Sequence, residues 1–149
     1  MRHFAYIKYL LRHKARVFLH SCLLGVPSRG ALHDLSKLSP VEYFGIGRQF
    51  FPSTPQEREL NEEMFRQSKL HHFARNQHHF EYWHREDGSS QESPLPVCRE
   101  IICDWAAVQG CALSVSQVKK LARKSYTNWG KNYRMHPATQ QWFLDFLGI

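Results

Sequence analysis

Apolar residues recur at helical spacing along most of the chain, and this pattern predicts an all-α fold. A first helix is expected from about Phe4 to Leu24, because Gly25 and Pro27 form a stop signal directly after it. No strand pair, internal repeat or domain linker is evident in the sequence. The pattern therefore predicts one compact, single-domain helical bundle over residues 1–149.

Proline, glycine and short polar residues separate the remaining helices. We expect these at 31–38, from Ser39, from near Gln56 past His72, over 97–109, from Ser114 and from Pro137. The helix at Ser39 begins with the pattern of a capping box, in which Pro40 occupies the first turn and Glu42 reaches back to the cap. The polar segment 86–94 is expected to be a mobile loop.

Two polar residues fall where the helical pattern asks for apolar ones. His13 lies on a helix face about 80° wide that also carries Tyr6, Leu10, Val17, His20 and Leu24. Asp104 shares a stripe with Val97, Ile101, Val108 and Cys111. A buried carboxylate needs a cation, a hydrogen-bonding network or a proton. Taken alone, His13 also fits a hydrogen-bonded core histidine, and Asp104 fits a cap or an ion-pair partner.

The segment 33–37 reads H-D-L-S-K and lies between these two positions in the chain. Adjacent His and Asp side chains can bind one metal ion when the backbone curves around it. The ordered set of His13, His33-Asp34 and Asp104 resembles the HD-domain superfamily of metal-dependent phosphohydrolases, and Lys37 completes its H-D-x-x-K form. The chain more closely resembles a family of small bacterial and phage proteins of unknown function. That resemblance rests on His13-Lys14, on 33–37 and on the histidine-rich block 71–83.

The resemblance implies a set of metal ligands and a fold of the HD type. The implied ligands are His13, His33, Asp34 and Asp104, extended by His72 and His79. They would hold one or two divalent ions (Mn, Fe, Co, Ni, Zn or Mg), with Asp34 bridging the two if the site is binuclear.

A helix continuing over 70–80 would place His72, Arg75 and His79 on one face, toward the metal. Asp34, Lys37 and Arg75 are then the expected catalytic residues. Lys37, Arg75, His71 and His78 are the expected substrate contacts. Taken alone, the histidine pairs would equally suit a structural zinc site, or packing and surface positions.

The function implied is hydrolysis of a phosphate ester, with a small anionic nucleotide or nucleotide-like molecule as the substrate. Two alternatives stay open: a catalytically inactive sensor that binds a metal or a nucleotide, and a basic nucleic-acid-binding module. The net charge of +7 and the basic run 119–124 permit the module. We do not favour it, because the basic residues are scattered over every helix and no helix-turn-helix or zinc-finger spacing is evident.

Composition and cysteine spacing bear on the compartment. No apolar run approaches the roughly 18 residues of a membrane span, and the amino terminus has no continuous hydrophobic segment. The four cysteines include no C-x-x-C pair, so we expect reduced core thiols in a cytoplasmic protein.

Overall fold

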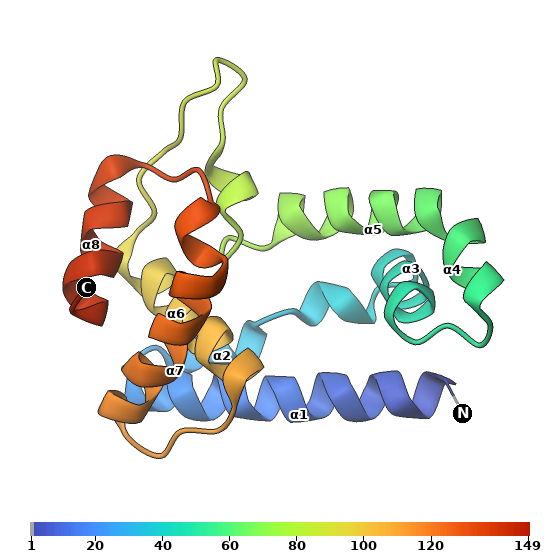
Figure 1. The fold of residues 1–149 in the computed structure, drawn as a ribbon, viewed down its shortest axis with the longest axis horizontal. Coiled ribbons are helices and arrows are strands. Elements are labelled where there is room, and N and C mark those ends of the chain that lie inside the picture. The colour runs from blue at the N-terminus through green and yellow to red at the C-terminus, as the bar shows by residue number, and fades with distance from the viewer. Residues whose placement is uncertain (1) are drawn as a thin grey trace.

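A computed structural model describes residues 2–149, and it describes side chains from residue 3 onward (Figure 1). The α-helices are α1 (Arg2–Leu23), α2 (Pro27–Leu32), α3 (Pro40–Phe50), α4 (Pro55–Leu60), α5 (Glu62–Arg75), α6 (Leu95–Gln109), α7 (Val115–Asn128) and α8 (Pro137–Leu147). Short 3-10 turns are η1 (Leu35–Leu38), η2 (Phe80–Trp83) and η3 (Gly130–Asn132). Within the described chain there are no β-strands, which confirms the all-α prediction.

Helix α1 runs the length of the molecule and contacts two groups of helices (Figure 1). Its carboxyl-terminal half packs with α6, α7 and α8 around the main hydrophobic core, in which Val17, Ile102 and Phe143 are fully buried. Its amino-terminal half faces α3, where the Tyr6 ring lies 5.2 Å from that of Tyr43. Helix α5 packs on α3 and lies across from α1. Helices α3 and α5 and the amino-terminal half of α1 therefore lie beside the main core and not within it.

The boundaries of several helices follow from their capping residues. Ser39, Thr54 and Ser114 each accept a hydrogen bond from a backbone N–H three residues later. The predicted cap at Ser39 is confirmed, but the capping box is wrong in one respect. The Glu42 side chain is fully buried and bonds to Ser36, His71 and His72 instead of reaching back to the cap.

The apolar face predicted for α1 is the face that packs. Tyr6, Val17 and His20 are each at most 1% exposed. The His20 ring is satisfied by backbone groups: Nδ1 donates to the Cys103 carbonyl, and Nε2 accepts from the Ala112 N–H at 2.9 Å. His20 is therefore a core histidine with a structural role.

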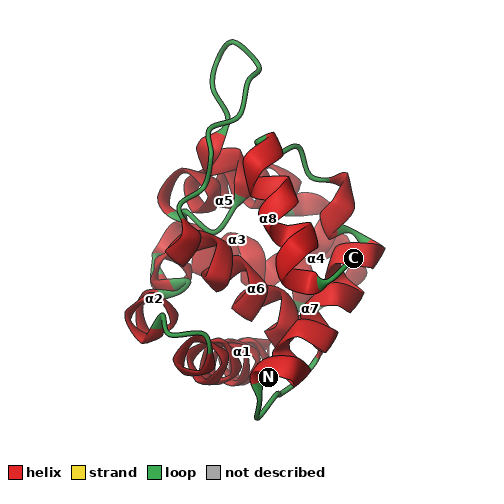
Figure 2. Ribbon diagram, turned by 90° about the vertical axis from the view of Figure 1, so that its left-hand side faces the viewer, coloured by secondary structure: helices red, strands yellow, loops and turns green. Residues whose placement is uncertain are grey.

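The cysteine prediction is half right. All four thiols are free, but only Cys98 and Cys103 are buried, whereas Cys22 and Cys111 are exposed. None of the helices in the described chain combines the length and the apolar character needed to cross a membrane. The segment that contains 86–94 projects from the helices as a loop (Figure 2), closed at its base by a bridge between His84 and Ser90. Its mobility stays a prediction.

The contact between α3 and α5 gives a test of the packing. A methyl group at Gly45 would overlap Ser68 Oγ and approach the Met64 carbonyl oxygen at 2.8 Å. We expect Gly45→Ala to lower the free energy of unfolding by about 1–3 kcal/mol, because overpacking outweighs the helix propensity of alanine. Urea denaturation measures this, with Gly110→Ala as the control, since the nearest atom there lies at 3.8 Å. Equal stability of the two variants would contradict the packing.

Candidate metal centre

Three helices and two turns bring histidine and carboxylate side chains together in the space beside the core. We call these residues the ligand cluster: His13 from α1, His33 and Asp34 from the turn after α2, His72 from α5, His78 and His79 from the turn after α5, and Asp104 from α6. Asp34 has a φ of 57°, the only positive φ at a non-glycine position among the described residues. Lys14 stabilises this turn, because its Nζ donates to the carbonyls of Ala31 and His33 at 2.8 and 2.9 Å.

The first part of the cluster joins His13, His33 and Asp104. The Nε2 atoms of His13 and His33 lie 3.0 and 3.7 Å from the same oxygen, Oδ1 of Asp104. All three residues offer ligand atoms within 4.8 Å of one another, which is the separation found around a bound ion. The sequence placed these residues far apart in the chain, and the fold brings them to one point.

The second part joins Asp34 with His72, His78 and His79. Oδ1 of Asp34 lies 3.4 Å from Nε2 of His72 and 3.2 Å from Nε2 of His78. The Nε2 atoms of His72 and His79 face each other at 2.9 Å, so at most one of them carries a proton on that side. These four residues also offer ligand atoms within 4.8 Å of one another.

Asp34 connects the two parts through different oxygens. Oδ1 faces the second part, whereas Oδ2 lies 3.3 Å from Nε2 of His33 in the first. Lys37 Nζ also contacts Oδ2, at 2.6 Å, and occupies one of its two lone-pair directions. This arrangement is that of a carboxylate able to bridge two cations.

Two buried glutamates orient the ring nitrogens of the cluster. Glu100 Oε1 accepts from Nδ1 of His33 at 2.9 Å and lies 3.2 Å from Nδ1 of His78. Glu42 Oε2 lies 2.7 Å from Nδ1 of His72. Because a carboxylate only accepts, each Nδ1 carries a proton and each Nε2 points into the cluster. Carboxylates commonly hold metal-binding histidines in this way.

Glu100, His33 and His78 also form a group of ligand atoms close enough to hold an ion. However, both oxygens of Glu100 already accept a hydrogen bond: Oε2 from Arg29 Nε at 2.6 Å and Oε1 from His33 Nδ1 at 2.9 Å. The Nδ1 distances are also those of ordinary hydrogen bonds. We therefore assign this group to the support of the cluster.

Protonated His33 and the ammonium group of Lys37 offset the negative charge of the buried carboxylates. Burial disfavours the charged form of His33, but Asp34 outweighs this effect and raises the pKa of His33 to about 10. Burial and the neighbouring His78 hold the pKa of His79 well below that of a free imidazole, so His79 is neutral near pH 7. Burial also opposes ionisation of Glu100, yet hydrogen bonds from His33 and His78 hold its carboxyl pKa far below its usual range.

Two buried atoms of the cluster, Nε2 of His33 and Oδ1 of Asp34, make no well-aligned hydrogen bond in the described chain and have only ion-pair contacts of 3.2–3.7 Å. Buried polar atoms are rarely left in this state without water, an ion or a functional role. Nε2 of His33 faces Oδ2 of Asp34, and Oδ1 of Asp34 faces Nε2 of His78, so both atoms point at other ligand atoms of the cluster. The donor set, imidazole with carboxylate, suits Mn, Fe, Co, Ni or Zn. The residues therefore fit one or two divalent cations.

A cavity of about 550 Å³ opens onto the cluster. His13, Asp34, His72, His78, His79 and Asp104 line one side of it, together with Lys37. The remaining lining residues are mainly aromatic and aliphatic. Its volume is typical of a small-molecule site.

Three residues of the histidine-rich block (His71, Arg75 and His78) differ in position from the helical prediction. Helix α5 ends at Arg75, because Asn76 is extended and its side chain donates to the His72 carbonyl and to Ser36. The turn brings both His78 and His79 to the cluster, so His78 lies among the ligand atoms. Arg75 is exposed and borders a separate hollow beside Arg29, outside the cavity. His71 points to Glu42 Oε1 at 2.6 Å and does not line the cavity.

Sequence reasoning did not identify Glu100 and Glu42 as part of the site. Glu100 had a detectable signal, because it lies one helical turn before Asp104 on a mostly apolar helix. Glu42 had none, since its position after Ser39-Pro40 is that of an ordinary capping residue.

Comparison with known families places the chain. A family model described as a family of unknown function, DUF5662, matches residues 2–149. The chain belongs to this family. No curated protein and no solved structure matches it, and no HD-domain model does. DUF5662 membership agrees with the resemblance to a family of unknown function, and the wider relationship to HD-domain proteins stays a prediction.

Glu100 provides a test of the cluster that leaves every ligand in place. We expect Glu100→Gln to weaken binding of Mn²⁺ by about 10- to 100-fold, because the amide no longer fixes the rings of His33 and His78 as a charged acceptor. Calorimetric titration measures the affinity, and circular dichroism checks the fold. Glu92→Gln is the control, since Glu92 is exposed. Equal affinity in the wild type and Glu100→Gln would contradict this role.

Proposed function

We propose that this protein is a metal-dependent hydrolase of phosphate esters, built on a fold of the HD type. The observation that carries the proposal is the position of Asp34, whose two oxygens face two separate groups of ligand atoms beside a cavity. Paired cations held by a shared carboxylate are typical of enzymes that cleave phosphate esters. When bound there, divalent cations would supply activation of a water molecule and polarisation of the phosphoryl oxygens.

The side chains of the cavity would bind and orient an anionic substrate. Lys37 lines the cavity, and its ammonium group lies where it can neutralise a phosphoryl oxygen next to Asp34. Arg75, which lies outside the cavity, has no such position. Lys37 is therefore the basic residue to which we assign substrate binding. A nucleotide or nucleotide-like ester fits the volume of the cavity, and we propose this class as the substrate.

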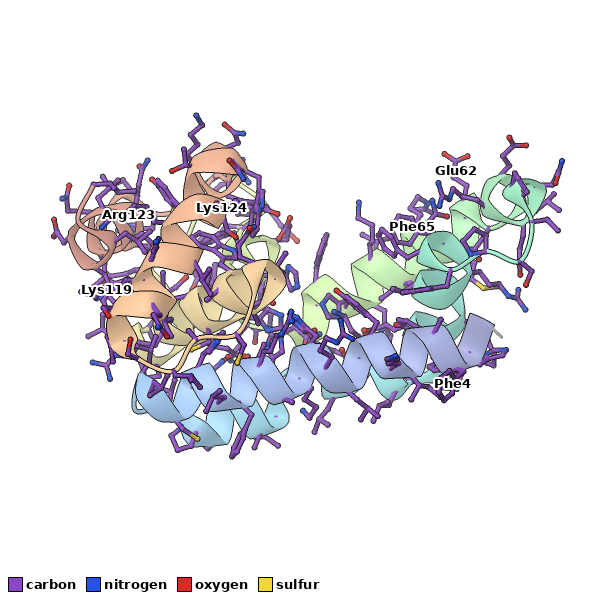
Figure 3. All side chains as sticks on the ribbon, turned by 60° about the horizontal axis from the view of Figure 1, so that its bottom comes forward. Phe4, Glu62, Phe65, Lys119, Arg123 and Lys124 are labelled. Carbon is purple, nitrogen blue, oxygen red and sulfur yellow. The ribbon has the colours of Figure 1, made fainter. Side chains whose placement is uncertain are left out.

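The basic run of α7 has contacts of its own. Arg123 donates through Nε and Nη2 to the Leu147 carbonyl, and Lys119 Nζ lies 4.4 Å from the centre of the Phe146 ring. These contacts join α7 to α8, at the end of the molecule away from Phe65 and α5 (Figure 3). Part of the positive charge thus stabilises helix packing, and we do not propose a nucleic-acid interface.

Asp34→Ala tests the proposed function. We expect the purified wild type to contain one or two divalent ions per chain and to cleave members of a panel of phosphomonoesters and phosphodiesters with added Mn²⁺, Mg²⁺ or Ni²⁺. The variant is expected to lose the metal and to fall to the uncatalysed rate, because one group loses its carboxylate and the other loses the oxygen beside His33. Elemental analysis and release of phosphate or alcohol are the measurements.

Asp87→Ala is the matched control, since Asp87 lies on the exposed loop and its carboxylate accepts a hydrogen bond from the backbone N–H of Ser89. Retention of the full metal content by Asp34→Ala would contradict the ligand assignment. A wild type that holds metal but cleaves no ester in the panel would contradict hydrolysis and favour a sensor.

A further inference from the structure

Aromatic side chains make up much of the cavity lining beyond the ligand cluster. We call this part of the lining the aromatic half: Tyr6 and Tyr9 from α1, Phe50 and Phe51 from the end of α3, and Phe65 and Phe73 from α5. Leu10, Ile46 and Val108 line the cavity with them, and among the described residues Lys69 is the one Lys, Arg, Asp or Glu that lines this half.

Several of these rings are only partly covered by the protein. Phe50 is 61% exposed and Tyr9 is 45% exposed, although both line a concave space. The Phe50 and Phe65 rings meet edge to face with centroids 5.6 Å apart. Aromatic rings left uncovered inside a cavity have apolar area to gain by binding a ligand.

A buried hydroxyl and a ring–ring contact lie at the boundary between the aromatic half and the ligand cluster. The Tyr6 side chain is 1% exposed, and its hydroxyl is buried without a hydrogen-bond partner among the described residues. The Phe73 ring lies 4.9 Å from the His79 ring, so the aromatic half begins directly beside the ligand cluster. A molecule whose phosphate lies at Lys37 would extend its remaining part along these rings.

We propose that the aromatic half is a binding subsite for a planar ring on the leaving-group side of the phosphate ester. This inference rests on the proposed function, since the ligand cluster has to hold the phosphoryl group. The rings provide stacking surfaces that accept any planar apolar face, and few side chains there offer hydrogen bonds. The site therefore selects esters of aromatic alcohols or of nucleosides over esters of small or aliphatic alcohols.

The test compares three phosphonates that cannot be hydrolysed: methylphosphonate, cyclohexylphosphonate and phenylphosphonate. Calorimetric titration of the Mn²⁺-loaded protein is expected to give a dissociation constant for phenylphosphonate about 10-fold lower than that for methylphosphonate. The constant for cyclohexylphosphonate should lie between them, since its ring is apolar but not planar. Equal affinities for the phenyl and cyclohexyl compounds, or for all three, would overturn the proposal.

A double variant, Phe50→Leu with Phe65→Leu, removes two stacking surfaces and retains apolar side chains. We expect it to abolish the preference for phenyl over cyclohexyl, with methylphosphonate as the internal reference. Phe4→Leu is the matched control, because Phe4 is 76% exposed on α1 and does not line the cavity (Figure 3). An unchanged preference in the double variant would overturn the assignment to these rings.

Failure of the proposed phosphate-ester function can be distinguished from failure of the ring subsite. If no phosphonate binds the metal-loaded protein, the phosphate-ester function is contradicted, and the ring subsite is then decided with phenol. Saturation-transfer NMR that detects phenol on the wild type but not on the double variant would support the subsite. Absence of transfer to phenol on the wild type would overturn it.

Discussion

The buried carboxylate of Asp34 is the constraint around which the site is arranged. An isolated buried charge is costly, so the groups around it have to compensate it. Lys37 contacts one oxygen, His72 and His78 approach the other, and His33 lies beside the first. The left-handed backbone at this residue is also unfavourable without glycine, and it persists because neighbouring bonds hold the turn.

Lys14 and the two buried glutamates extend this arrangement into the fold. Lys14, the residue that follows His13 on α1, donates hydrogen bonds to the turn that carries Asp34. Glu100 joins α6 to the turn and to His78, while Glu42 joins α3 to α5 through His72. The polar network therefore connects helices that belong to both halves of the molecule. A cation at the cluster would act on all of them at once, which couples metal binding to the stability of the fold.

The sequence predicted the helices well because most begin at a capping residue or a proline and carry an apolar face. It could not distinguish His13 from His20, since both lie on the same face of α1. The difference depends on neighbours distant in the chain: backbone groups at Cys103 and Ala112 satisfy His20, whereas His13 meets Asp104.

The facing of the histidine block was predicted for a helix that continues over 70–80, but α5 ends at Arg75. Asn76 ends α5 by bonding to Ser36, forty residues earlier, and helical periodicity gives no information about such a contact. The resulting turn moves His78 to the ligand atoms and leaves Arg75 outside the cavity. The aromatic half was equally invisible in the sequence, since its rings come from three helices whose packing only the fold determines.

Anomalous X-ray diffraction from crystals grown with Mn²⁺ would locate the bound cations relative to Asp34. We expect one or two peaks beside Asp34, and two peaks would lie on opposite sides of it, about 3.5–4 Å apart. One would be bounded by His13, His33 and Asp104, and the other by His72, His78 and His79. A peak between Glu100 and the Nδ1 atoms of His33 and His78, or none beside Asp34, would rule out Asp34 as the ligand on which the site depends.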